Sequence, residues 1–263
     1  MIDIRTKIIW NGTLDELDPK FGILRNFTAY EDKFKSWHLI NSDDTVIETK
    51  ILSVIFIGQT GYGKSTLLNK LIGKEVFETS DIEACTKSLN AALYALSDNQ
   101  ENIHPKHYIS FVDLPGIGES NKADEKYLQW YKKYIEDAAA VIYLFRADKR
   151  DHTADEYFFN NVFSTKSDSK LICTVSQADK IEPFRGEEML SHPQRLNLLK
   201  KEHELKTKSF LRYKRALIVS ISSHLDFNID MLKDEIIYKL IRSDIDSENV
   251  KSLLKIVEKT FIK

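Results

Sequence analysis

The chain has 263 residues, of which 42% are hydrophobic and 30% charged, and its formal net charge is −2. This composition supports a folded core and excludes a wholly disordered chain, and the near-neutral charge gives no global attraction to nucleic acid or to an anionic membrane. The two cysteines, Cys85 and Cys173, are far apart, as in proteins with reduced thiols, so we expect a cytoplasmic protein. The most apolar runs, Leu52–Gly58 and Ala138–Phe145, are too short for a transmembrane segment and suit buried strands.

Residues 1–50 show only weak periodicity, and we expect an N-terminal extension that packs on the core. From residue 51 on, apolar strands alternate with helices, which predicts parallel strands joined by helical crossovers. The expected strands are Leu52–Ile57, Leu89–Leu96, His107–Asp113, Val141–Phe145, Leu171–Ser176 and Ala216–Ser220. The expected helices are Lys64–Ile72, Ala123–Ile135, Ala154–Phe163, Pro193–Leu211 and Ile229–Ile241. We therefore predict an α/β fold, a three-layer doubly wound sandwich with a mainly parallel sheet over residues 51–243.

A C-terminal helix is expected at residues 244–263, where apolar side chains recur at helical spacing. It would either pack on the domain or bind a partner.

A phosphate-binding loop is predicted at residues 58–65, which read Gly-Gln-Thr-Gly-Tyr-Gly-Lys-Ser and follow the pattern G-x-x-x-x-G-K-[ST]. The loop lies between an apolar strand and a helix, so backbone N–H groups and the helix N-terminus can meet phosphate oxygens. We expect Lys64 to reach the β- and γ-phosphates and the Ser65 hydroxyl to ligate Mg²⁺. The expected nucleotide-binding residues here are Gln59, Thr60, Gly61, Tyr62, Gly63, Lys64, Ser65 and Thr66.

Two further segments are predicted to meet the metal and the γ-phosphate. Asp113 ends an apolar strand and is expected to serve the Mg²⁺ site, and Gly116, which has no side chain, can bring its N–H close to the γ-phosphate. Thr86, between the first helix and the next strand, can offer its hydroxyl to Mg²⁺ and its N–H to the γ-phosphate. Thr79 and Ser80 are competing candidates. The predicted metal ligands are thus Ser65, Thr86 and Asp113, and the predicted catalytic residues are Lys64, Thr86 and Gly116.

Base recognition is predicted after the strand Leu171–Ser176, where the chain reads Gln177-Ala178-Asp179-Lys180. The Asp179 carboxylate can accept two hydrogen bonds from guanine, and adenine lacks that pair of donors. Gln177 and Lys180 flank the base site, and the loop that contains Ser222 and Ser223 is expected to meet the guanine oxygen.

These motifs resemble the Era/TrmE-like group of the translation-factor-related GTPases, and among them the YfjP-type bacterial GTPases. The resemblance covers roughly residues 50–242 and is carried by GQTGYGKST at 58–66, CTK at 85–87, FVDLPGIGES at 111–120, RADKRDHTADEYFF at 146–159 and SQADKIEP at 176–183. It implies a P-loop NTPase, Ras-like fold, GTP and GDP binding, Mg²⁺, and slow hydrolysis of GTP to GDP and phosphate. It implies no particular effector or cellular task.

The sequence departs from the family pattern at three positions. Ser176 replaces an Asn that ties the base loop to the phosphate loop, so guanine affinity could be reduced and ATP binding stays an alternative. Ile117 stands where Ras-like proteins have a Gln that orients water, so turnover should be slow unless a partner completes the site. Gly61 replaces the Asn of potassium-activated members. The loop form is also similar to that of septin-like and immunity-related GTPases, which makes a nucleotide-dependent homodimer, or an interaction module with incidental hydrolysis, the alternative reading.

Residues 195–215 form a basic segment that could contact ribosomal RNA, although a solvated helix is the simpler expectation and we do not predict an RNA or ribosome partner. The residues expected to face partly inward on this helix are Leu196, Leu199, His203 and Phe210. His152 is expected at the surface.

Overall fold

The computed structural model describes residues 6–29, 34–79, 89–96, 107–117, 121–183, 188–211, 214 and 216–241. Two sequence predictions, the Cys85-Thr86-Lys87 segment and the helix at residues 244–263, lie outside this part of the chain. None of the helices in the described part is long and apolar enough to cross a membrane.

An eight-stranded sheet runs through the molecule in the order β2-β1-β4-β5-β3-β6-β7-β8. Its strands are β1 (Thr6–Thr13), β2 (Lys35–Ile40), β3 (Val46–Gly58), β4 (Asn90–Ala95), β5 (His107–Asp113), β6 (Ala140–Arg146), β7 (Leu171–Ser176) and β8 (Leu217–Ser220). Strands β5, β3, β6, β7 and β8 are parallel, and β4 runs antiparallel to β5. The carboxyl ends of the parallel strands therefore meet at one edge, where ligands of doubly wound sheets bind.

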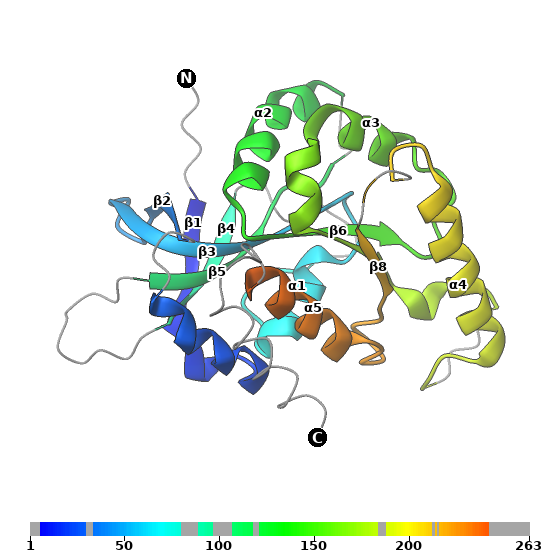
Figure 1. Cartoon of the computed structure of the whole chain (residues 1–263), viewed down its shortest axis with the longest axis horizontal. Helices are drawn as coiled ribbons and strands as arrows, with labels where there is room; N and C mark the ends of the chain where they lie inside the picture. The colour runs from blue at the N-terminus through cyan, green and yellow to red at the C-terminus, as the bar shows by residue number, and fades with distance from the viewer. Residues whose placement is uncertain are drawn as a thin grey trace.

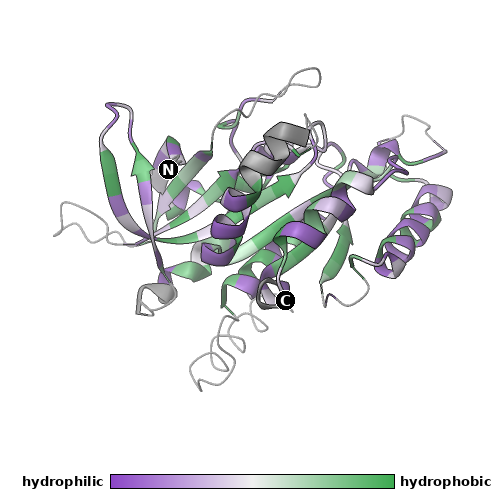
Figure 2. Ribbon diagram, turned by 90° about the horizontal axis from the view of Figure 1, so that it is seen from above, coloured by the Kyte–Doolittle hydropathy of each residue, from purple (hydrophilic) through white to green (hydrophobic). Residues whose placement is uncertain are grey.

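Helices cover both faces of the sheet (Figure 1). The helices are α1 (Lys64–Ile72), α2 (Asn121–Asp137), α3 (Thr153–Val162), α4 (His192–Thr207) and α5 (Ile229–Ile241). Buried side chains of α1 and α5 belong to one apolar cluster, and those of α2, α3 and α4 belong to a second cluster on the other face. The strands between them are largely hydrophobic (Figure 2), as expected for a sheet covered on both sides. The predicted fold class, a three-layer α/β sandwich, is confirmed.

The N-terminal residues form part of the sheet. Strand β1 pairs in parallel with β4, and β2 pairs with β1 and also, in antiparallel register, with the first half of β3. Strands β3, β2, β1, β4 and β5 thus close into a ring, and β8 is the free edge among the described strands. The weak periodicity of residues 1–50 did not indicate these strands, because their pairing depends on partners far along the chain.

Two 3₁₀ segments, η1 (Leu14–Glu16) and η2 (Pro19–Ala29), follow β1; η2 packs beside α5, and η1 packs against η2 and β4. Phe21 is fully buried and meets the ring of Phe111 edge-on at 5.5 Å between centroids. The Lys233 ammonium of α5 donates a 2.6 Å hydrogen bond to the Asp18 carboxylate. The extension is therefore joined to the domain by apolar burial and by an ion pair.

Most predicted elements are found within one or two residues of the expected bounds, but the strand expected from Leu52 begins at Val46, where it pairs with β2. The predicted ranges Lys64–Ile72, His107–Asp113, Leu171–Ser176 and Ile229–Ile241 are reproduced. The helix expected to reach Leu211 ends instead at Thr207, because Lys208 has an extended backbone conformation.

Candidate functional site

The phosphate loop connects β3 to α1 at the carboxyl edge of the sheet. Gly61 and Gly63 have φ angles of 78° and 81°, a left-handed conformation that glycine adopts without steric cost. Gly63 caps α1, so the free N–H groups of the first helical turn face the loop. The Lys64 ammonium curls back over the loop and donates to the carbonyls of Gly58 and Gln59 at 3.2 and 3.4 Å. The loop therefore has the backbone form of an anion-binding cradle with a cation beside it.

Ser65 and Asp113 lie side by side at the ends of α1 and β5. The Ser65 hydroxyl donates to the Asp113 carboxylate at 2.6 Å, and Asp113 is only 1% exposed. A hydroxyl and a carboxylate are oxygen ligands of the kind that Mg²⁺ prefers. Of the predicted metal set, the structure brings Ser65 and Asp113 together, while Thr86 lies outside the described residues; its competitor Thr79 is exposed.

Gly116 lies directly against the phosphate loop. A Cβ atom at this position would lie 2.8 Å from the Thr60 nitrogen and 2.9 Å from the Thr60 Cα, and closer still to the Thr60 hydroxyl. Only glycine fits there without displacing backbone. The next residue, Ile117, donates its N–H to the Gly58 carbonyl at 3.2 Å and is 3% exposed. Its side chain packs in the apolar cluster shared with α2 and α3, so no polar group occupies the position of a water-orienting Gln.

The base loop is tied to the phosphate loop by two side chains. The Ser176 hydroxyl lies 2.7 Å from the Tyr62 carbonyl and 3.0 Å from the Phe145 carbonyl, and can donate to either. Gln177, in the left-handed conformation at φ 54°, donates its Nε2 to the Gly61 carbonyl at 2.8 Å. Loss of the family Asn therefore does not leave the two loops unconnected, because a hydroxyl and an amide bridge them instead.

Asp179 is held from several sides. The Ser222 hydroxyl donates to its carboxylate at 2.5 Å, and Gln194 of α4 donates to its backbone carbonyl at 3.3 Å. The neighbouring Ala178 N–H bonds to the Ile221 carbonyl at 2.9 Å, which joins the loops after β7 and β8.

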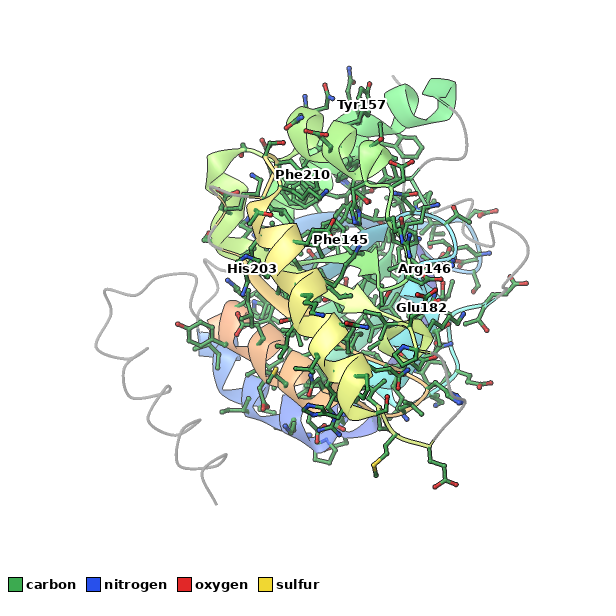
Figure 3. The ribbon with its side chains drawn as sticks, turned by 90° about the vertical axis from the view of Figure 1, so that its right-hand side faces the viewer. Phe145, Arg146, Tyr157, Glu182, His203 and Phe210 are labelled. Atoms are coloured by element: carbon green, nitrogen blue, oxygen red, sulfur yellow. The ribbon has the colours of Figure 1, made fainter. Side chains whose placement is uncertain are left out.

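The flanking predicted residues, Lys180 and Ser223, are exposed and half-buried respectively. Figure 3 shows Arg146, the last residue of β6, and Glu182, which lies beyond β7, on the same side of the molecule, with Tyr157 of α3 well away from them.

Two polar residues behind the phosphate loop were missed or misjudged from the sequence. His152, expected at the surface, is 6% exposed, because it packs beside the Phe145 ring and contacts Asp155 and Lys201. Asp155 is fully buried and accepts a hydrogen bond from Gln59 of the phosphate loop at 3.1 Å. A signal for Asp155 existed: it shares the buried helical face of α3 with Phe158, Phe159 and Val162, where a carboxylate is unusual.

Tyr62, to which no chemistry was assigned, is 2% exposed, and burial together with the nearby Asp155 raises the pKa of its phenol.

On α4, most of the residues that were expected to face inward do not. Leu196, Leu199 and His203 are exposed, whereas Phe210, beyond the helix end, is buried as expected. The helix instead buries Leu198, Lys201 and Leu205. Its hydrophobic residues point in several directions, so periodicity alone did not identify the inner face.

Comparison with known proteins agrees with this geometry. A family model described as "50S ribosome-binding GTPase" matches residues 53–177. The chain is 34% identical over 145 residues to the uncharacterized protein YfjP of Escherichia coli K12, covering 55% of this chain and 48% of YfjP. It is 28% identical over 185 residues to GTPase Era of Caldanaerobacter subterraneus subsp. tengcongensis, covering 70% of this chain and 53% of Era. The chain thus spans about half the length of the curated relatives it matches.

Among solved structures, Era in complex with MgGDPNP and a segment of 16S ribosomal RNA is similar at a TM-score of 0.54 and 25% identity. The similarity covers 73% of this chain and 57% of the Era chain.

Proposed function

We propose that this chain, which carries a P-loop GTPase domain of the Era-like group, binds GTP and hydrolyses it to GDP and phosphate with Mg²⁺, as a slow nucleotide-dependent switch. The observation that carries the proposal is the meeting of three elements at one sheet edge. These are the phosphate loop, the Ser65–Asp113 pair beside it and the Asp179 carboxylate bound by Ser222. The loop would bind the phosphates, the Ser65–Asp113 pair would bind the metal, and Asp179 would bind the guanine base.

Ser65 and Asp113 are the described residues that would hold Mg²⁺, with Thr86 as the further ligand proposed from the sequence. Bound Mg²⁺ would neutralise charge on the phosphate oxygens. The Lys64 ammonium would leave the carbonyls of Gly58 and Gln59 for the β- and γ-phosphates, where it stabilises the charge of the transferring group. The Gly116 N–H would bind the γ-phosphate. Because GDP lacks this phosphate, the loop after β5 would adopt different conformations in the GTP and GDP states.

Slow turnover follows from the burial of Ile117. Its side chain belongs to the apolar core, and nothing polar replaces the water-orienting Gln at this position. We expect the rate constant of intrinsic hydrolysis to be smaller than about 1 s⁻¹, which is the lower end of ordinary enzyme rates. Single-turnover measurement of phosphate release by the purified monomer tests this expectation, and a faster rate would contradict it.

Guanine selection is assigned to Asp179. Its carboxylate is oriented by the Ser222 hydroxyl, so it can accept from two guanine donors that adenine does not have. The test is competition of unlabelled GTP and ATP against a fluorescent GDP, with the wild-type chain and with Asp179→Ala. We expect GTP to compete far better than ATP in the wild type and the preference to vanish in the variant. Equal competition by ATP in the wild type would favour the mixed-nucleotide alternative.

A second candidate function is a nucleotide-dependent homodimer or interaction module in which hydrolysis is incidental. The buried Ile117 favours it, because a second molecule would then have to supply the group that positions water. Light scattering with GDP and with a non-hydrolysable GTP analogue discriminates between the two. A change of mass with the analogue supports the module, and a monomer in both states with appreciable hydrolysis supports the simple enzyme.

The cytoplasmic location and an effector protein stay predictions, and contact with RNA or the ribosome stays an open alternative that the sequence does not favour. The structure of Era that resembles this chain contains ribosomal RNA. For this chain, the buried Lys201 removes one cation from the basic surface of α4. Nucleotide-dependent pull-down from native extract, with the recovered proteins and RNA identified, tests for an effector protein and for RNA contact, and the identity of the partners bears on the location.

A further inference from the structure

A buried polar cluster lies behind the phosphate loop and is not explained by the proposed nucleotide contacts. Its centre is Asp155 of α3, which is 0% exposed. One carboxylate oxygen accepts from the Tyr143 hydroxyl at 2.8 Å and from the Gln59 Nε2 at 3.1 Å. The other oxygen lies 3.0 Å from the His152 Nδ1. A buried carboxylate is costly unless it is well bonded, and here donors from β6, the phosphate loop and the start of α3 converge on it.

The bonding also fixes which nitrogen of His152 carries the proton. The Lys201 ammonium of α4 lies 3.0 Å from the His152 Nε2 and donates to the Lys149 carbonyl at 2.5 Å. An ammonium group only donates, so the Nε2 must accept and the Nδ1 must carry the hydrogen that points to Asp155. The neutral imidazole thus connects a buried cation on α4 to a buried carboxylate on α3. Both ring nitrogens of His152 are thereby bonded.

Gln59 links this cluster to the phosphate loop. It is the second residue of the loop, and its backbone carbonyl accepts from the Tyr62 N–H at 3.2 Å and from the Lys64 ammonium at 3.4 Å. Gln59 therefore makes two connections. Its backbone carbonyl closes the turn and binds Lys64, and its side chain is bonded to Asp155. Loss of the hydrogen bond between Gln59 and Asp155 would free the turn, and with it the carbonyl that holds Lys64, to shift.

We propose that Asp155 is a positioning residue for the phosphate loop, acting through the Gln59 side chain to hold the loop in the form that receives nucleotide phosphates. This inference rests on the proposed nucleotide binding and extends it to a residue outside the nucleotide contacts. Because the cluster acts on the loop that receives the phosphates, its loss should weaken the binding of all nucleotides by a similar factor. Discrimination between GTP and ATP is assigned to Asp179, which lies on the loop after β7 and is held by Ser222 and Gln194, so it should not change.

The experiment uses Gln59→Met, which keeps a similar volume without the amide, Asp155→Leu, which removes both acceptor oxygens, and the double variant. Titration with fluorescent GDP and GTP should show roughly tenfold weaker binding for each single variant, the scale of one hydrogen bond to a charged group. The double variant should be little weaker than either single one, because both break the same connection. The ratio of GTP to ATP affinity should stay within twofold of the wild type.

Tyr143→Phe is the matched control, because it removes a second donor from the same carboxylate and leaves Gln59 in place. It should lower thermal stability while nucleotide affinity stays within twofold. Circular dichroism and thermal unfolding report whether each variant is folded. Gln59→Met changes a half-buried position, so it still tests the inference if Asp155→Leu does not fold. Wild-type affinity in Gln59→Met would overturn this inference alone, as would fully additive losses in the double variant. No nucleotide binding by the unmodified chain would overturn the proposed function as well.

Discussion

Replacing Gly116 by Ala tests how closely the loop after β5 and the phosphate loop depend on each other. The added Cβ would lie 2.8 and 2.9 Å from the backbone nitrogen and Cα of Thr60, well inside ordinary contact distance. Because these are backbone atoms of a tight turn, a side-chain rotation cannot relieve the overlap. The two loops must move apart by several tenths of an ångström, and the hydrogen bond from the Ile117 N–H to the Gly58 carbonyl must lengthen.

The magnitude follows from overpacking, which costs about 1–3 kcal/mol when the surroundings cannot give way. We expect the Gly116→Ala variant to lose stability in this range. The displaced N–H should also bind the γ-phosphate less well, so affinity for a non-hydrolysable GTP analogue should fall by about tenfold or more, while GDP, which has no γ-phosphate, is affected much less.

Urea unfolding and titration with fluorescent nucleotides measure both effects. Gly22→Ala on η2 is the matched control, since a Cβ there meets nothing within 4 Å and no left-handed φ is required. The control should stay within about 0.5 kcal/mol of the wild type and bind both nucleotides normally. Wild-type stability in Gly116→Ala, or an equal loss of GDP and GTP-analogue affinity, would refute this reasoning.

Three further predictions follow from individual contacts. Ser176→Ala removes the hydroxyl that reaches the phosphate loop, and it should cost about 1–3 kcal/mol in urea unfolding and weaken nucleotide binding; unchanged values would mean that the other contacts suffice. Phe21→Ala should destabilise the whole domain by roughly 3–5 kcal/mol in a single unfolding transition, and a separate early transition would mean that the N-terminal residues unfold on their own. Burial would raise the pKa of Asp18, but hydrogen bonds from Lys233 and from a backbone N–H, with nearby positive charge, outweigh it and hold the pKa below its usual range. Its stabilisation is therefore present above about pH 4 and lost on further acidification, so Asp18→Asn should cost about 0.5–1 kcal/mol at pH 7 and almost nothing near pH 2; a difference independent of pH would contradict this.

Local sequence was sufficient for the phosphate loop, since its glycines, Lys64 and Ser65 are adjacent in the chain and their backbone requirements are local. The strands and helices between residues 51 and 241 were also predictable, because buried parallel strands are continuous apolar runs and most of the helices have a regular apolar face. Asp113 and Asp179 could be placed at the site because Asp113 ends one predicted parallel strand and Asp179 follows another, and the carboxyl ends of such strands share one edge.

The contacts between distant residues depended on the tertiary structure. The sequence predicted a weakened connection at Ser176, yet Ser176 and Gln177 bond to loop residues more than 100 positions away. His152 looks like an ordinary polar residue near a surface loop, and although the helical pattern places Asp155 on an apolar face, only the fold shows that both belong to one buried cluster behind Gln59. The N-terminal strands joined the sheet through β4 and β3, for which their own residues gave no periodic signal. In each case the reason is the same. Periodicity and motifs report what neighbouring residues require of each other, whereas a buried hydrogen bond or a strand pairing is decided by partners that only the folded chain brings into contact.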